Sequence, residues 1–171
     1  MPNWCYNHLT LSNDDKSKID ALQEVLSSKN DQDVHNGELF QHLRPRPEEF
    51  NESWFSWNVD NWGTKWEISP SDWDLVDDNT ISVSFDSAWN APIELYEYLS
   101  EEGWLVDAFY EESGVGFCGK YFDGDNECYE YNFEEEDWRD GIPEDVIEFA
   151  DLEQNYEDWK EWQEEDEEDE A

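Results

Sequence analysis

The feature that most narrows what this chain can fold into is its charge: 48 acidic residues face nine basic ones, giving a formal net charge of −39 at pH 7. A chain so charged repels itself, and most sequences of this kind lack the apolar surface needed to fold. This one carries eleven tryptophans, and aromatic residues make up 16% of its length. Because each aromatic ring brings a large area to a core, the sequence predicts a folded domain with a strongly anionic surface.

Such a surface limits the classes of partner. It repels nucleic acid and anionic membranes, and it attracts cationic partners, among them proteins that normally hold DNA or RNA. No stretch approaches the roughly 20 apolar residues of a membrane helix, and no secretory signal is visible. The three cysteines, Cys5, Cys118 and Cys128, are widely spaced and odd in number, which indicates reduced thiols. We therefore expect a cytoplasmic protein without membrane contact.

The charge is unevenly distributed along the chain. Residues 1–50 hold nine acids and five bases, residues 51–132 hold nineteen and two, and residues 133–171 hold twenty and two. Nearly half of the net charge thus lies in the last segment. This predicts a domain over residues 1–132 and an acidic helical extension over residues 133–171.

Strand and helix patterns alternate in the first half of the chain. Residues 3–11 alternate apolar and polar side chains and predict a strand, and residues 14–28 have the spacing of an amphipathic helix. Residues 29–53 predict a loop, because two prolines at positions 45 and 47 exclude regular structure there. Residues 64–68, after Gly63, alternate like a second strand.

The clearest strand covers residues 80–86, where Ile81, Val83 and Phe85 share one face. A second helix opens at Pro92 and ends at Gly103. Further strands are expected at residues 104–110, 115–122 and 127–132, the last two joined by a hairpin at residues 123–126. The order β-α-β-β-α-β with extra strands predicts an α+β fold: a split βαβ antiparallel sheet with two helices on one face.

A last helix is expected after Pro143. Phe149, Leu152, Tyr156 and Trp159 recur on one side of it, and seven consecutive acids, residues 164–170, precede Ala171.

Four short segments follow one another in the order found in a known family: MPNWCYN (residues 1–7), NWGTKW (61–66), FDSAWNAP (85–92) and YEESGVGFCG (110–119). With them the chain resembles the Api92-like, YubB-type family, small proteins of phages and conjugative plasmids with a ferredoxin-like domain. The resemblance covers roughly residues 1–120. It implies a ferredoxin-like fold and a mobile-element, phage-type origin, and it brings no catalytic residues. Residues 137–144 are also similar to short acidic stretches in ArdA-type antirestriction proteins, which imitate DNA.

The acidic end of the chain has two interpretations. As a helix it presents one charge per roughly 1.5 Å of axis, close to the one charge per roughly 1.7 Å of duplex DNA. Alternatively it is a solvated, frayed tail, because like charges four residues apart oppose a helix. The net charge of residues 51–132 lies inside the expected domain, however, and cannot be assigned to a tail.

Other residue patterns favour structural roles. Six tryptophans at positions 54, 57, 62, 66, 73 and 89 have only Lys65 among nearby bases, which favours packing over base stacking. Residues 123–127 resemble a calcium loop, but Cys128 stands where that loop needs glycine. Cys5 and His8 are expected on opposite faces of a strand. We expect no metal, no cofactor and no catalytic site.

The sequence thus favours a non-enzymatic, phage-type acidic inhibitor, located in the cytoplasm of an infected bacterial host. It would mimic nucleic acid and occupy the basic cleft of a host defence or other DNA- or RNA-handling protein, as an anti-restriction or anti-defence protein does. The alternative is an assembly module that docks through the aromatic side of its last helix, and a homodimer is compatible with both. The predicted partner-binding residues are Asp123, Asp125, Glu134, Glu135, Glu136, Asp137, Glu144, Asp145, Tyr156, Trp159, Glu164, Glu165, Asp166, Glu167, Glu168, Asp169 and Glu170.

Overall fold

The computed structural model describes residues 2–28 and 38–170, with the side chains of the last helix described as far as Asp166. Its elements in chain order are β1 (Trp4–Ser12), α1 (Lys16–Ser27), α2 (Leu39–Leu43), the 3-10 turn η1 (Glu48–Phe50), α3 (Trp54–Trp62), β2 (Asp72–Asp77), β3 (Thr80–Ala88), α4 (Ile93–Glu101), β4 (Leu105–Glu112), β5 (Phe117–Phe122), β6 (Asp125–Glu130), α5 (Glu144–Ala150) and α6 (Leu152–Glu170).

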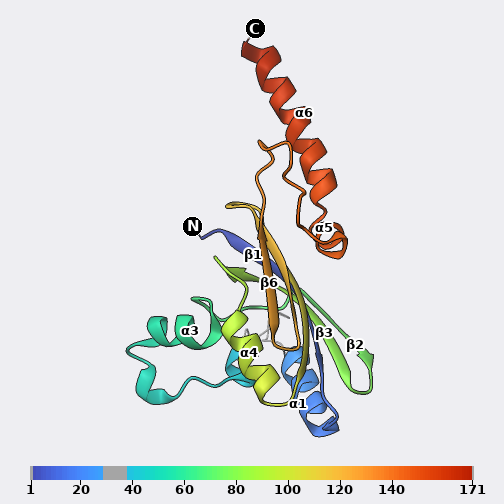
Figure 1. The fold of residues 1–171 in the computed structure, drawn as a ribbon. Coiled ribbons are helices and arrows are strands. Elements are labelled where there is room, and N and C mark those ends of the chain that lie inside the picture. Colours follow the sequence, from blue (N-terminus) through green and yellow to red (C-terminus); the bar gives the residue numbers. More distant parts are fainter. Residues whose placement is uncertain (1, 29–37, 171) are drawn as a thin grey trace.

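The strands form one antiparallel sheet in the order β2-β3-β1-β4-β5-β6 (Figure 1). The first four strands, with α1 joining β1 to β2 and α4 joining β3 to β4, have the split βαβ arrangement of a ferredoxin-like sheet. β5 and β6 extend the sheet beyond β4. The predicted α+β fold with extra strands is confirmed.

Helices cover one face of the sheet over its whole centre. Alternate residues of the central strands, such as Leu9, Val83 and Ala108, are buried in one apolar cluster with side chains from α1, α2, α3 and α4. The strand period of two places every second side chain on this face. α1 and α4 are the two helices that the sequence predicted, and α2 and α3 join them on the same side.

The segment after β6 covers part of the opposite face. Cys118 of β5 is buried with Trp138, Val146, Ile147 and Leu152, and Phe109 of β4 packs against the same group. This second cluster fixes the start of the acidic segment to the sheet.

Two predicted elements are wrong. Residues 64–68 form no strand; the second strand is β2, and the aromatic stretch before Gly63 is the helix α3. Trp62 is buried and Gly63 ends the helix with φ +85°, the left-handed conformation that favours glycine. The predicted loop over residues 29–53 contains α2 and η1, and its residues 29–37 lie outside the described part.

The helix α2 forms because a distant carboxylate caps it. Glu67 accepts hydrogen bonds from the backbone N–H groups of Phe40 (2.8 Å) and Gln41 (2.7 Å), and also from that of Ile68 (3.0 Å). The first N–H groups of a helix have no partner inside it, so Glu67 acts as a cap from another part of the chain.

Gly119 of β5 offers a test of the sheet packing. A Cβ at this position would collide with the carbonyl oxygen of Glu127 and with the hydroxyl of Tyr110. We expect Gly119→Ala to lower the free energy of unfolding by about 2 kcal/mol, because neither neighbour is free to move in the sheet. Urea unfolding followed by tryptophan fluorescence measures this. Gly124→Asn is the control, since nothing lies near a Cβ there. Its φ of +96° adds backbone strain that Asn tolerates better than most side chains, so we expect a smaller loss; an equal loss in both variants would contradict the steric explanation.

Candidate functional site: an acidic helix that leaves the sheet

The predicted last helix is two helices, broken at Asp151. Asp151 has φ +51°, which ends α5 because a left-handed residue cannot continue a helix, and α6 begins at the next residue. The side-chain amide of Asn155 donates to the carbonyl of Ala150 (3.0 Å) and bridges the break. α5 therefore lies on the sheet while α6 points away from it, as Figure 1 shows.

Four aromatic rings hold the base of α6. Tyr156 lies 5.2 Å from Trp138, 5.5 Å from Phe133 and 6.0 Å from Trp159 between ring centroids. Phe133 and Trp138 flank the loop after β6, so this loop and the first two turns of α6 form one packed unit. Aromatic pairs at these distances contribute beyond their buried area.

Beyond Lys160 every described side chain of α6 is exposed. Nineteen residues at about 1.5 Å each make a rod of about 28 Å. Lys160 is the one base among the described side chains of α6, and its ammonium donates to Glu157 (2.8 Å). The predicted contact residues on the exposed part are Glu164, Glu165 and Asp166; the side chains of Glu167, Glu168, Asp169 and Glu170 lie outside the described ones.

The other predicted acids are distributed over three places. Glu134, Glu135, Glu136 and Asp137 are all exposed and lie in the loop between Phe133 and Trp138, beside the base of α6. The structure thus brings these four together with α6.

Glu144 and Asp145 are engaged in ion pairs within the chain. Arg139 donates to Glu144 (2.7 Å) and also contacts Glu153, and Lys120 lies 3.1 Å from Asp145. Their charge is partly neutralised before any partner arrives, so they contribute less to an anionic surface than the free acids of α6.

Asp123 and Asp125 lie in the turn between β5 and β6, at the other end of that hairpin. Asp123 (φ +45°) and Gly124 (φ +96°) form the predicted turn with two positive φ angles. The hairpin arms of six residues separate this turn by roughly 17 Å from the loop that carries Glu134. The structure does not bring Asp123 and Asp125 together with α6.

The aromatic side of the last helix is largely engaged within the chain. Phe149 belongs to α5, where its ring lies 5.7 Å from that of Tyr6 and 5.2 Å from that of Phe109, and Leu152 is fully buried. Tyr156 and Trp159 pack in the ring group described above. Because the helix breaks at Asp151, the predicted aromatic side of one helix becomes two separate contacts, one of α5 with the sheet and one of α6 with the loop after β6.

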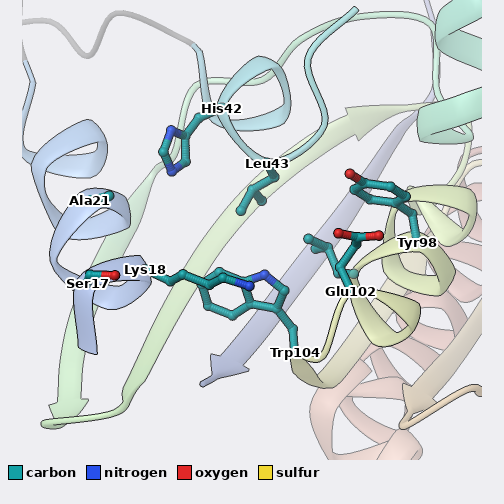
Figure 2. Close-up of a pocket in the computed structure, with 9 residues that line it drawn as sticks. Ser17, Lys18, Ala21, His42, Leu43, Tyr98, Glu102 and Trp104 are labelled. Carbon is teal, nitrogen blue, oxygen red and sulfur yellow. The ribbon is translucent and has the colours of Figure 1, made fainter. Parts of the chain in front are cut away.

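The structure also contains a cavity of about 380 Å³ on the helical face, between α1, α2 and α4 (Figure 2). It is lined by Ser17, Lys18, Ala21, His42, Leu43, Tyr98, Leu99, Glu102 and Trp104. Burial lowers the pKa of His42, which favours its neutral form. Lys18 and Glu102 face the cavity from different walls. None of the predicted site residues lines it.

One hydroxyl–imidazole pair escaped the sequence analysis. His8 of β1 and Ser84 of β3 are direct cross-strand partners, and His8 Nδ1 lies 2.9 Å from Ser84 Oγ. The pair lies on the face of the sheet opposite α1 and α4, and it lines none of the cavities named in this article. Cys5, as expected, points to the opposite face and is buried; burial raises the pKa of its thiol and keeps it protonated.

Two negative findings concern the described residues alone. Within residues 2–28 and 38–170, no helix is long and apolar enough to cross a membrane. In the same part of the chain, no group of three or more His, Cys, Asp or Glu side chains is arranged to hold a metal ion.

Comparison with known proteins adds little to this geometry. No family model and no curated protein matches the chain. Among solved structures, the chain is similar to the crystal structure of protein api92 from Yersinia pseudotuberculosis, of the family DUF1281, with 11% sequence identity and a TM-score of 0.44 over 77% of this chain and 99% of that one. This is the kind of protein that the sequence motifs suggested, but the similarity is too distant to establish a family or to support a function.

Proposed function

We propose that this protein is a non-enzymatic, phage-type inhibitor that mimics nucleic acid and occupies the basic cleft of a host protein that handles DNA or RNA. The observation that carries this proposal is α6, a helix anchored by aromatic packing at its base and lined by exposed carboxylates beyond Trp159. Over residues 164–170, where every residue is an acid, the axial spacing of about 1.5 Å per charge resembles the roughly 1.7 Å of duplex DNA.

The mechanism is electrostatic occupation. Carboxylates of α6 and of the loop with Glu134 to Asp137 take the places of phosphates against Lys and Arg of the cleft. The net charge of −39 steers a basic partner toward the surface and keeps nucleic acid away. The proposed protein binds neither nucleic acid nor a membrane directly. We propose that it acts in the cytoplasm of an infected bacterium.

The alternative of an assembly module has less support. Most of the aromatic side chains that it would use contact this chain's own residues, and Trp162, with 56% of its surface exposed, is the large apolar side chain that α6 leaves in solvent. A homodimer through Trp162 is an outcome that light scattering detects.

The proposal predicts what the immobilised full-length chain captures from a bacterial lysate. We expect proteins that bind nucleic acid, eluted by raising NaCl from 0.1 to 0.5 M and displaced by duplex DNA, because each replaced phosphate contact is screened by salt. Mass spectrometry identifies the eluted proteins. If the captured proteins stay bound to the immobilised chain in 1 M NaCl and in excess duplex DNA, occupation of a nucleic-acid cleft is the wrong mechanism.

A further inference from the structure

An exposed group of aromatic side chains surrounds Lys65, far along the chain from α6. Trp4, Phe55, Trp66 and Trp89 are 50%, 45%, 36% and 42% exposed. The Lys65 ammonium lies 4.3 Å from the ring centroid of Trp66, 5.0 Å from that of Trp89 and 5.9 Å from that of Phe55, and Trp4 lies 6.2 Å from Trp66. We call these five residues the Lys65 cluster. Apolar surface gathered in this way marks a site of interaction.

The aromatic rings of the cluster already surround one cation, the ammonium group of Lys65. A cation within about 6 Å of an aromatic ring centroid is attracted by the electrons of the ring face. Among the described residues Lys65 forms no ion pair, although the chain is rich in carboxylates. The three rings are thus arranged so that a positive charge is stable between them.

The ring of Trp89 is held in solvent by a strained backbone conformation. Trp89 has φ +68°, in the left-handed region that a bulky side chain rarely adopts. Its N–H donates to the carbonyl of Asn3 (2.9 Å), and Thr64 donates to the neighbouring carbonyl of Ala88 (2.8 Å). Strain that the surrounding bonds maintain is typical of functional positions, and the ring that this strain presents remains 42% exposed.

Two carboxylates lie beside the cluster, that of Glu67 partly buried and that of Asp86 exposed. Trp4, Glu67 and Asp86 line one cavity of about 360 Å³, and Glu67 and Trp66 line a second cavity. Burial raises the pKa of both Glu67 and Asp86, so each carboxylate would be stabilised by a cation placed near it.

We propose that the Lys65 cluster binds an arginine side chain of a protein partner, whose guanidinium stacks on the exposed indoles and donates to Asp86 or Glu67. Arginine fits because its planar group is weakly hydrated, stacks on aromatic faces and pairs with carboxylates. A nucleic-acid base and a second copy of this chain are disfavoured by the charge of −39. The inference concerns residues other than those of α6 and holds whether or not α6 binds a partner.

The test uses a small probe in high salt, so that general attraction to the acidic surface is screened. The full-length chain, labelled with ¹⁵N, is titrated with acetyl-Gly-Arg-Gly-amide in 0.5 M NaCl, and the indole N–H signals of its tryptophans are followed by NMR. We expect the signals of Trp4, Trp66 and Trp89 to shift, and the same peptide with neutral citrulline to bind about threefold to tenfold more weakly. Equal binding of the citrulline peptide, or no shift at these indoles, overturns the proposal.

Lys65 gives a second, sharper test. Because its ammonium competes for the same ring faces, Lys65→Met should tighten binding of the arginine peptide several-fold. Lys16→Met on α1 makes the same change in net charge away from the cluster and should leave binding unchanged. If both variants bind alike, Lys65 does not occupy an arginine site.

Trp89→Asn separates binding from folding. Asn accepts the left-handed conformation, so we expect this variant to unfold at the same or a higher temperature than the unaltered chain while the shifts of Trp4 and Trp66 with the arginine peptide are lost. A lower unfolding temperature with binding retained would show that the Trp89 ring is a structural element only.

Discussion

Replacing Glu161, Glu164 and Glu165 by lysine is expected to weaken binding to a captured basic partner about 100-fold at physiological salt. The three side chains are exposed and, at spacings of three and four residues, share one face of α6. Loss of three charge contacts at about 1 kcal/mol each gives a total near 3 kcal/mol. The measurement is competition between the variant and fluorescent duplex DNA for the partner, read by anisotropy.

The substitutions are chosen so that folding does not confuse the result. Lysine has nearly the helix propensity of glutamate, and positive charge favours the end of a helix where its carbonyls are exposed, so far-UV circular dichroism should show equal or greater helix content. The matched control reverses Asp72, Asp74 and Asp78, three exposed acids on β2 and the turn after it, which changes the net charge equally. We expect less than about a fivefold loss for this control. Equal losses in the two variants would mean that the partner responds to net charge and not to α6.

Truncation is a poorer test of the same idea. A chain ending at residue 132 would lose Trp138, Val146, Ile147 and Leu152, and it would expose the face of Cys118 that they cover. Loss of binding in such a chain would report damage to the second buried cluster as much as the removal of α6. The division into domains at residues 132 and 133 stays a prediction, and substitution on the exposed part of α6 avoids it.

The sequence predicts β3 and the turn between β5 and β6 correctly, because neighbouring residues determine both. Alternation at Ile81, Val83 and Phe85 gave a strand whose buried face is the expected one, and the Asp-Gly pair at residues 123 and 124 gave the hairpin turn. In both places the side-chain period or the backbone conformation is fixed by adjacent residues.

The errors occur where distant contacts decide the structure. Residues 64–68 alternate like a strand. In the structure, however, Glu67 accepts hydrogen bonds from the first N–H groups of α2 and Thr64 donates to the carbonyl of Ala88, and these contacts keep the segment a loop. Tryptophans were assigned to packing as a class; Trp62 is buried, whereas Trp66 and Trp89 are exposed around Lys65. No spacing rule distinguishes these cases, because the sheet and α3 determine which rings meet solvent.

Glu67→Gln is expected to change how stability depends on pH. Burial raises the pKa of Glu67 from 4.5 to about 7, although three backbone N–H groups oppose this by favouring the carboxylate. A carboxyl whose pKa is higher in the folded state binds its proton more tightly there. Its contribution to stability is fully present below about pH 4.5 and is lost as the pH rises through about 7. Glutamine carries no charge, so the variant escapes this loss.

The unaltered chain should therefore be the more stable of the two at low pH, and Glu67→Gln the more stable at high pH. At pH 5 we expect Glu67→Gln to be about 1 kcal/mol less stable, because its amide NH₂ cannot accept from the N–H of Gln41. Between pH 5 and pH 8 the difference should move by about 2.5 kcal/mol in favour of glutamine, measured by urea unfolding at each pH. Glu67→Ala, which caps neither N–H group, should be destabilised at both pH values. A difference that instead moves in favour of the unaltered chain at pH 8 would mean that the N–H groups of α2 outweigh burial, and that Glu67 is ionised when it caps this helix.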